Sequence, residues 1–284
     1  RADPVALAAV NVGINVVARF TDVDGRGLYL RAAHPSIRTQ AETRAAYEYL
    51  THLADNDVAG CRPIPAQHGD LIAQVDFDDF YATVVTEVPG EPMRLDGTDM
   101  AVFEAWGHSL GVLHNAAATY TPSTGTTFST FGQFWANVRP VVPLARPEIQ
   151  QIYAQLDAWM QSLPDDDIIL THGDYRPGNV IWDGETAWAV DFDEPVYNWA
   201  ITDVARALLE YSDRDDRHAI KAAFLRGYRR VRPLDVAWVA RLPELMQLRG
   251  TIMHLWDLQG LADDGANSST DWAVQWALNR VDWG

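Results

Sequence analysis

Two short stretches decide the expected fold: His172-Gly173-Asp174-Tyr175-Arg176-Pro177-Gly178-Asn179 and Val190-Asp191-Phe192-Asp193-Glu194. The first places a carboxylate at Asp174 five residues before the amide of Asn179, and the second adds another carboxylate at Asp191. Phosphoryl transfer from a magnesium nucleotide needs a base beside the attacking hydroxyl and oxygen ligands for the metal. The spacing therefore predicts a kinase.

The residue types suit this chemistry. Asp174 can accept the proton of a hydroxyl, and the oxygens of Asn179 and Asp191 suit Mg²⁺, a hard cation. Between them, Asp183-Gly184 separates two apolar runs, which is typical of a tight hairpin. The hairpin would bring Asn179 and Asp191 to the same end. Each residue alone is more typical of a turn or helix cap, so the prediction rests on the joint pattern.

The run HGDYRPGN followed by VDFDEP resembles the catalytic and metal loops of the aminoglycoside phosphotransferase and choline kinase-like family. This family includes homoserine kinase-like and bacterial stress-kinase members and shares the protein-kinase fold. The resemblance implies that Asp174 is the catalytic base and that Asn179 and Asp191 bind Mg²⁺. It also implies that His172 is a buried structural residue. Asp193 matches an acid that some members carry, and we assign it to the metal site, with a substrate contact or a structural role as alternatives.

The N-terminal segment is expected to cover the nucleotide phosphates. A turn precedes a strand at 16–20, and a second strand is predicted at 28–31. This resembles the family's phosphate-covering hairpin, with Gly13 in the turn and Asn15 at its characteristic asparagine.

The same resemblance places the phosphate-binding cation at Arg31, where protein kinases use lysine. The only lysine of the chain, Lys221, lies far downstream. Arginine is always charged and binds phosphate oxygens through a planar fork. A helix capped by Ser36 and running over 37–55 should present an acid to Arg31. Glu42 is the candidate; otherwise another group positions Arg31, or the enzyme is impaired.

The rest of the first lobe is predicted as strands at 71–75 and 80–85, followed by a hinge where Pro89-Gly90 stops the sheet. In the family the adenine bonds the hinge backbone, so Glu87 and Val88 are the candidate nucleotide contacts. We therefore expect an α+β, two-lobed protein-kinase-like fold. Its small antiparallel-sheet lobe with one helix would span 1–88 and bind nucleotide. Its larger, mainly helical lobe would span 89–284, with the catalytic and acceptor sites.

Helical periodicity dominates the second lobe. Asp203, near the start of one such helix, matches a family residue that braces the catalytic loop, and its alternative role is a first-turn acid favoured by the helix dipole. The predicted helices are 99–117, 147–163, 201–211, 216–230, 235–260 and 270–282.

A motif of another enzyme class also occurs. Gly107-His108-Ser109-Leu110-Gly111 fits the G-x-S-x-G pattern of a hydrolase, in which Ser109 would be the nucleophile. That motif requires a strand before the serine and a tight turn at it. Here the flanking residues continue a helical apolar stripe, so we expect a helix and no hydrolase.

Composition excludes several partners. The chain of 284 residues can hold one two-lobed domain or two small ones. Its single cysteine, Cys61, excludes an internal disulfide and fits a reducing cytoplasm. No apolar run approaches the roughly 20 residues of a membrane helix. The net charge of -17 argues against nucleic acid. We expect a cytoplasmic protein. The sequence determines neither its oligomeric state nor whether a segment precedes Arg1.

The acceptor is expected to be the hydroxyl of a small molecule. The acidic balance permits a cationic acceptor such as an aminoglycoside, although a solvated acidic surface is the more ordinary explanation. Late tryptophans could stack on a substrate or fill the core. The acidic candidates for such a cleft are Asp257, Asp263, Asp264 and Asp271.

Three functions remain open at this point. The first is an ATP- and Mg²⁺-dependent transfer of the γ-phosphoryl group to a small-molecule hydroxyl. The second is a bacterial stress-type protein kinase that uses the same residues. The third is a nucleotide-binding pseudokinase, suggested by Arg31 in place of lysine. The sequence does not distinguish ATP from GTP.

Overall fold

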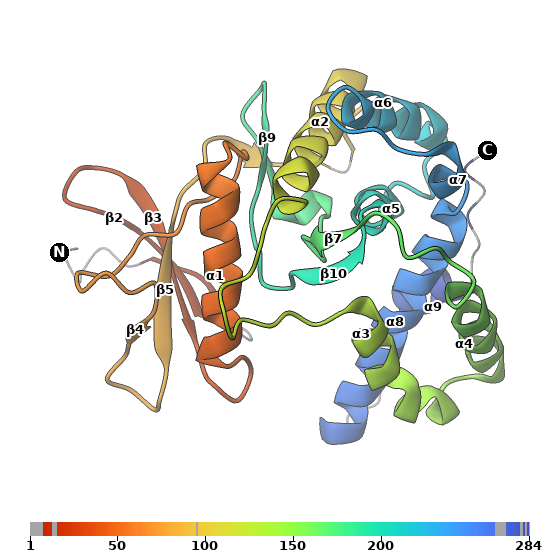
Figure 1. Ribbon diagram of the computed structural model, residues 1–284, viewed down its shortest axis with the longest axis horizontal. Coiled ribbons are helices and arrows are strands. Elements are labelled where there is room, and N and C mark those ends of the chain that lie inside the picture. The colour runs from red at the N-terminus through yellow and green to blue at the C-terminus, as the bar shows by residue number, and fades with distance from the viewer. Residues whose placement is uncertain are drawn as a thin grey trace.

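The computed structural model describes residues 8–12, 16–94, 96–264, 271–278, 281 and 283, with backbone alone at 8–12, 261–264 and 271–272. It has the expected α+β, two-lobed protein-kinase-like fold (Figure 1). The strands are β1 (Ala8–Val12), β2 (Val16–Thr21), β3 (Gly27–Ala33), β4 (Ala73–Gln74), β5 (Tyr81–Thr86), β6 (Glu91–Pro92), β7 (Ile168–Thr171), β8 (Val180–Trp182), β9 (Ala187–Ala189) and β10 (Val196–Trp199).

The helices are α1 (Gln40–Asp55), α2 (Met100–Ala117), α3 (Phe131–Val138), α4 (Pro147–Met160), α5 (Ile201–Leu209), α6 (Arg217–Arg229), α7 (Val236–Val239), α8 (Leu242–Asp264) and α9 (Asp271–Leu278). The described residues also include two 3₁₀ helices: η2 (Arg139–Leu144), between α3 and α4, and η3 (Pro177–Asn179), just before β8. Among the described helices, none is both long enough and apolar enough to cross a bilayer.

The small lobe is a five-stranded antiparallel sheet in the order β1-β2-β3-β5-β4, and α1 lies along it on the side facing the helical lobe (Figure 1). The predicted strand at 71–75 is shorter than expected, since only Ala73–Gln74 pair with β5. The Asp70 carboxylate accepts the backbone N–H of Ile72 at 3.1 Å, and this local turn competes with sheet pairing.

Helix α1 begins later than predicted. Thr39, and not Ser36, caps it, because the Thr39 hydroxyl accepts the N–H of Glu42 while the Glu42 carboxylate accepts the N–H of Thr39. Ser36 instead bonds the ring of His34 at 2.6 Å. Tyr49, Leu50 and Leu53 lie on the buried face of the helix.

Helices α2 and α6 pack unusually closely, and this explains the G-x-S-x-G motif. A Cβ atom on Gly107 would lie 1.9 Å from the backbone oxygen of Phe224, and one on Gly111 would lie 3.0 Å from that of Tyr228. Ser109 lies between them inside α2. The glycines therefore serve helix packing, and the hydrolase reading is excluded as expected.

The helical lobe differs from the prediction in two places. The segment predicted as one helix over 235–260 forms α7 and α8, because Pro243 has no N–H to continue the helix from Val239. The Asp235 side chain caps α7 through the N–H of Ala237 at 2.8 Å. Helix α3 was not predicted. Its start is a second capping box, in which Thr130 and Gln133 bond reciprocally.

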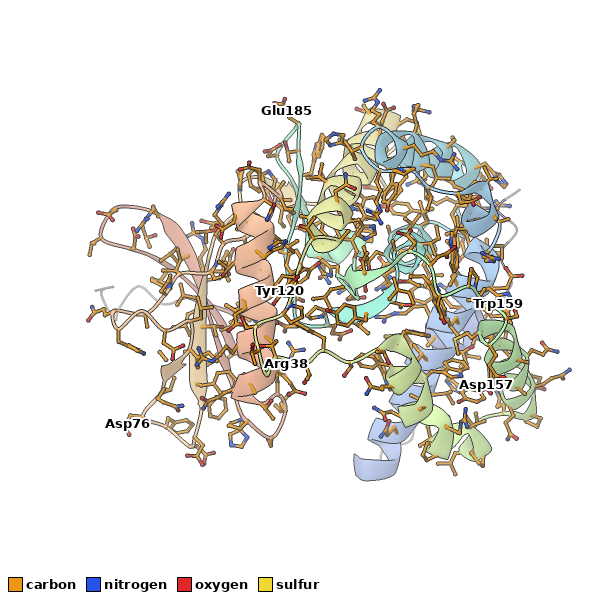
Figure 2. The ribbon with its side chains drawn as sticks, viewed as in Figure 1. Arg38, Asp76, Tyr120, Asp157, Trp159 and Glu185 are labelled. Carbon is orange, nitrogen blue, oxygen red and sulfur yellow. The ribbon has the colours of Figure 1, made fainter. Side chains whose placement is uncertain are left out.

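The predicted hairpin is present. Val180 pairs with Ala189 and Trp182 with Ala187 in antiparallel register. The Asp183 carboxylate accepts the backbone N–H of Thr186 at 2.7 Å, and Glu185 lies at the tip (Figure 2). The hairpin carries the predicted metal residues at its open end.

Candidate active site

A cleft of about 950 Å³ lies between the two lobes and collects most of the predicted site. Its walls come from β2, β3, α1, the segment after β5, the η3 turn and the loop after β9. Of the predicted residues, those lining it are Arg31, Glu87, Val88, Asn179, Asp191 and Asp193. Gly13 and Asn15, the predicted phosphate-covering residues, lie outside the described residues.

Asp203 of α5 holds the start of the catalytic loop by hydrogen bonds. Its carboxylate accepts the backbone N–H groups of His172 and Gly173 at 2.8 and 3.1 Å and contacts the His114 ring at 3.1 Å. Gly173 is in the left-handed region, with φ +83°, and a Cβ there would lie 2.0 Å from the backbone oxygen of Glu194. Asp203 therefore braces this loop, as the sequence suggested.

His172 is a structural residue, as predicted. Its side chain is fully buried, and Nε2 lies 3.1 Å from the backbone oxygen of Val190. Since a carbonyl oxygen can only accept, Nε2 carries the proton. His172 thereby joins the catalytic loop to the segment that leads into Asp191.

The carboxylate of Asp174 is surrounded by donors. Its Oδ1 accepts from Nε of Arg206 at 2.6 Å and from Nη2 of Arg249 at 2.9 Å. Its Oδ2 accepts from Nε of Arg176 at 3.2 Å and from Nδ2 of Asn179 at 3.1 Å. A carboxylate offers about four lone-pair sites, and these four donors occupy them.

Charge sets the protonation state of Asp174. Burial alone would raise its pKa, but Arg206, Arg249 and Arg176 outweigh burial and lower the pKa to about 2. The group is therefore a carboxylate throughout the neutral range. It can accept a hydrogen bond from a hydroxyl once one of its four donors moves away.

Asn179 is oriented as a metal ligand requires. Its Nδ2 donates to the backbone oxygen of Asp174 at 2.9 Å as well as to the Asp174 carboxylate. Because both bonds use the nitrogen, the amide oxygen remains available as an acceptor. Asp191, on the same cleft, has a left-handed backbone with φ +67°, which is uncommon for a residue other than glycine.

These oxygens fit a magnesium site completed by phosphate. Among the described residues, no group of three or more His, Cys, Asp or Glu is arranged to hold a metal alone. Mg²⁺ is usually bound through one or two carboxylates, waters and substrate phosphates, so such a group is not needed. Asn179 and Asp191 supply the oxygen chemistry, with Asp193 beside them in the cleft.

Arg31 joins the two lobes through these carboxylates. Its Nη1 donates to Oδ1 of Asp191 at 2.8 Å, and its Nη2 is paired with Asp193. Burial alone would lower the pKa of Arg31, but Asp193 and Asp191 raise it above its ordinary value. Arg38 adds a second cation 3.6 Å from Asp193. Asp193 thus neutralises arginines in this state.

Glu42 does not orient Arg31. Its carboxylate caps α1 by accepting the N–H and the hydroxyl of Thr39 at 2.9 and 2.7 Å. The α1 residues that line the cleft with Arg31 are Tyr47 and Leu50, and the Tyr47 hydroxyl accepts from Thr83 at 2.7 Å. Of the alternatives left open by the sequence, positioning of Arg31 by other groups is the one observed.

The segment after β5 lines the cleft with its backbone. The N–H of Glu87 donates to the oxygen of Gly27 at 2.9 Å, and its carboxylate pairs with Arg19 at 2.6 Å. Among the described residues, the backbone N–H and oxygen of Val88 take part in no backbone bond. Val88 therefore offers the free main-chain groups that an adenine ring would need.

Arg206 and Arg249 were missed by the sequence reasoning. Both arginines lie in helices whose neighbouring buried residues are mostly apolar, so the sequence predicts these positions to be core. Arg206 comes three residues after Asp203, so helical phase places it on the face that holds the catalytic loop. Leu245, Leu248 and Ile252 share a face with Arg249 in the same way. An arginine within an apolar stripe was the available signal.

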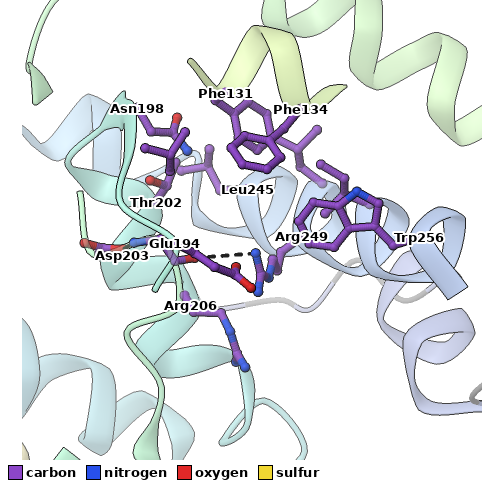
Figure 3. A pocket seen from close by; sticks show the side chains of 14 residues that line it. Phe131, Phe134, Glu194, Asn198, Thr202, Asp203, Arg206, Leu245, Arg249 and Trp256 are labelled. Carbon is purple, nitrogen blue, oxygen red and sulfur yellow. Dashed lines mark hydrogen bonds between the residues drawn. The ribbon is translucent and has the colours of Figure 1, made fainter. Parts of the chain in front are cut away.

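A second pocket lies beside the catalytic loop, with Gly173 in its wall (Figure 3). Arg206 and Arg249 lie in its wall, as does Glu194, which also lines the cleft. Asp257, proposed as part of an acidic acceptor cleft, is not among the lining residues, and the side chains of Asp263, Asp264 and Asp271 are not described. The lining is Phe131, Phe134, Gly173, Glu194, Val196, Asn198, Thr202, Asp203, Arg206, Leu245, Leu248, Arg249, Ile252 and Trp256.

A two-lobed kinase-like fold, a carboxylate on the catalytic loop and paired oxygens across a hairpin define a kinase with a hydroxyl acceptor. The chain belongs to the phosphotransferase enzyme family, whose sequence model matches residues 9–234.

Relatives and solved structures agree with this membership. The chain is 26% identical to amicoumacin kinase of Bacillus subtilis (strain 168), over 85% of this chain and 78% of that protein. It is 29% identical to homoserine kinase of Caulobacter vibrioides, over 93% of this chain and 83% of that protein. The structure of amicoumacin kinase hAmiN in complex with AMP-PNP, Ca²⁺ and Ami superposes with a TM-score of 0.86 at 19% identity, covering 98% of this chain and 88% of that one.

Proposed function

We propose that this kinase transfers the γ-phosphoryl group of ATP to the hydroxyl of a small molecule and that it requires Mg²⁺. The observation that carries the proposal is the convergence of Asp174, Asn179 and Asp191 where the interlobe cleft and the second pocket share Glu194 in their walls. Nucleotide would occupy the cleft, and the acceptor would enter from the pocket.

The chain's own groups divide the work. Val88 would bond the adenine, and Arg31 would bind the phosphates once it leaves Asp191. Asn179 and Asp191 would hold Mg²⁺, which supplies charge neutralisation on the phosphates when bound. Gly13 and Asn15 remain our candidates for covering the phosphates.

Asp174 would orient the acceptor. The hydroxyl oxygen attacks the γ-phosphorus, the bond from phosphorus to the bridging oxygen breaks, its electron pair leaves with ADP, and the hydroxyl proton passes to Asp174. Phosphoryl transfer depends mainly on positioning and charge stabilisation, so a weakly basic carboxylate is sufficient.

Arg176 is the donor that would make room for the hydroxyl. Its bond to Asp174, at 3.2 Å, is the longest of the four, and 40% of its side chain is exposed, against 8% for Arg206 and 16% for Arg249. On release, its guanidinium would face the transferring group. Arg206 and Arg249 would stay and hold Asp174 in place.

We further propose that the lobes divide at Val88, so that residues 1–88 bind nucleotide and 89–284 carry the catalytic and acceptor sites. Strand β5 ends at Thr86, and Gly90 has φ +106°. A Cβ on Gly90 would lie 2.2 Å from the backbone oxygen of Trp182, so the chain here must pass close to β8.

The test is phosphoryl transfer from ATP and from GTP, with and without Mg²⁺, across amino alcohols, homoserine, choline, amicoumacin, streptomycin and a generic protein, with Asp174→Asn as the control. We expect transfer to a small molecule that disappears in the control. Nucleotide binding without transfer to any acceptor would identify a pseudokinase, and transfer to protein alone would identify a protein kinase.

A further inference from the structure

The pocket beside Asp174 has an apolar wall made of aromatic rings. Phe131 and Phe134 of α3 and Trp256 of α8 are half-buried, and Figure 3 shows these rings on one side of the pocket and Glu194 and Arg206 on the other. The rings of Phe134 and Trp256 meet at 5.7 Å between centroids with 68° between their planes, an edge-to-face contact. Leu245, Leu248 and Ile252 continue the apolar surface.

The charged side chains of this pocket differ in how far they are already paired. Asp203 accepts from two backbone N–H groups and contacts His114. Arg206 is paired with Asp174 and with Glu210, the latter at 3.2 Å. Both are therefore occupied by the protein itself.

Arg249 cannot readily bind an anion from the pocket. Its Nη2 is bonded to Asp174, and its Nη1 lies 3.5 Å from the backbone oxygen of Gly173. Its remaining nitrogen, Nε, has no hydrogen-bond partner but is buried away from solvent. A ligand carboxylate would reach this arginine only by displacing a bond to the catalytic carboxylate.

Glu194 is the free charge of the pocket. Its side chain is exposed, and no hydrogen bond or ion pair joins its carboxylate to another described residue. It lines both the nucleotide cleft and the aromatic pocket, so it stands where the acceptor hydroxyl must pass. An ammonium group placed here would form an ion pair with this carboxylate.

We propose that the acceptor is an amino alcohol that carries one ammonium group and one flat apolar group. The ammonium group binds Glu194, and the apolar group lies against Phe131, Phe134 and Trp256. Polycationic sugars are disfavoured, because the described pocket offers a single unpaired carboxylate beside two arginines. This inference rests on the proposed function and gives it a substrate class.

The test uses four probes that vary one feature at a time. Phenylalaninol has a ring, an amine and a hydroxyl, 3-phenylpropan-1-ol lacks the amine, 2-aminopropan-1-ol lacks the ring, and streptomycin is a polycation. Binding is measured by calorimetry in the presence of AMP-PNP and Mg²⁺, and transfer by release of ADP. We expect phenylalaninol to bind on the order of tenfold or more tighter than either truncated probe, and tighter than streptomycin.

Two variants locate the contacts. Glu194→Gln should lower the affinity for phenylalaninol and 2-aminopropan-1-ol on the order of 10-fold to 100-fold, because it removes a charge-assisted bond to the ammonium group. The affinity for 3-phenylpropan-1-ol, which has no ammonium group, should not change. Phe134→Leu should lower the affinity only for the two probes with a ring, phenylalaninol and 3-phenylpropan-1-ol. Glu185→Gln, at the hairpin tip far from the pocket, is the matched control and should leave the affinity for every probe unchanged.

The outcomes separate this inference from the proposed function. Preference for phenylalaninol without any ADP release would keep the pocket assignment and remove the transfer. Transfer to streptomycin or to other acceptors, with no preference for phenylalaninol, would keep the transfer and overturn the assignment. Failure of phenylalaninol to bind would overturn it too, as would an equal loss of AMP-PNP affinity in Glu194→Gln, since the carboxylate would then belong to the nucleotide site.

Discussion

Arg31 of the small lobe and Asp191 of the large lobe, 160 positions apart in the chain, are joined by a bond of 2.8 Å from Nη1 to Oδ1. Each is the group that the proposed function assigns to an incoming ligand: Arg31 to phosphate and Asp191 to Mg²⁺. The two groups therefore neutralise each other in this structure. Nucleotide and metal must replace this ion pair together, so each should strengthen the binding of the other.

Arg31→Met should weaken nucleotide binding. The substitution removes the phosphate-binding fork and leaves Asp191 and Asp193 without this partner, so we expect the KM for ATP to rise on the order of tenfold or more. Steady-state kinetics with varied ATP will measure it. Arg26→Met, on the exposed turn between β2 and β3, should leave this KM unchanged. An unaltered KM in Arg31→Met would remove Arg31 from the phosphate site.

Asp174→Asn should abolish transfer while preserving ATP binding. The amide keeps the shape of the side chain but cannot accept the proton, and we expect kcat to fall by about 10²-fold to 10⁴-fold. Calorimetric titration with AMP-PNP should give an affinity close to that of the unmodified protein. Retained turnover would show that another group orients the hydroxyl.

Arg176→Ala should lower kcat without a comparable change in the KM for ATP. In our proposal this arginine leaves Asp174 and faces the transferring phosphoryl group, so its loss acts on the transition state. Arg214→Ala, in which an arginine outside the site loses its 2.7 Å bond to Asp216, is a control. Unchanged kcat in Arg176→Ala would contradict the proposed movement.

The pH dependence of turnover should respond to Arg249. Because the arginines hold the pKa of Asp174 at about 2, this group stays ionised and should impose no loss of activity down to about pH 4. Arg249→Gln removes one positive charge, so the pKa of Asp174 rises and activity should decline at a higher pH on the acid side. Profiles of kcat/KM, with circular dichroism to confirm folding at each pH, will show whether the acid limb moves upward. An acid limb that stays at the same pH in Arg249→Gln, or moves to lower pH, would contradict the role of Arg249 in lowering the pKa of Asp174.

Gly107→Ala should destabilise the helical lobe. The added Cβ would lie 1.9 Å from the backbone oxygen of Phe224, so α2 and α6 must separate, and we expect a loss of about 1–3 kcal/mol in the free energy of unfolding. Gly260→Ala in α8 is the matched control, since a Cβ there meets nothing within 4 Å and alanine favours a helix by about 1 kcal/mol. Urea unfolding of both will measure the difference. Equal stabilities would show that the close approach of the helices is not required.

The fold and the centre of the site could be predicted because they are encoded locally. The catalytic loop, the Asp183-Gly184 hairpin and the acid after it lie within one short segment, and turn chemistry alone brings Asn179 and Asp191 to one end. The small-lobe strands and the hinge likewise follow from residues next to one another in the chain. These features depend little on distant contacts.

The remainder depends on contacts between distant residues. Glu42 was the natural partner for Arg31, but its carboxylate closes a capping box with Thr39, three residues earlier, and Arg31 pairs with Asp191 instead. Arg206 and Arg249 reach Asp174 from helices 32 and 75 positions away in sequence, a convergence that helical phase suggests only once the packing is known. The aromatic pocket has the same origin, since α3 and α8 come together only in three dimensions.

The interlobe cleft contains an arginine where many kinases place a lysine, and the chain's one cysteine, Cys61, lines the same cleft. Burial raises the pKa of the Cys61 thiol to about 12, so it is not a thiolate at neutral pH, and a guanidinium is a poor nucleophile. Electrophilic reagents that acylate a kinase lysine or alkylate a cysteine would find nothing to react with in the described cleft. An inhibitor designed to react with a lysine or a thiolate could bind this cleft only reversibly, and labelling surveys that capture kinases through such a lysine would miss this protein.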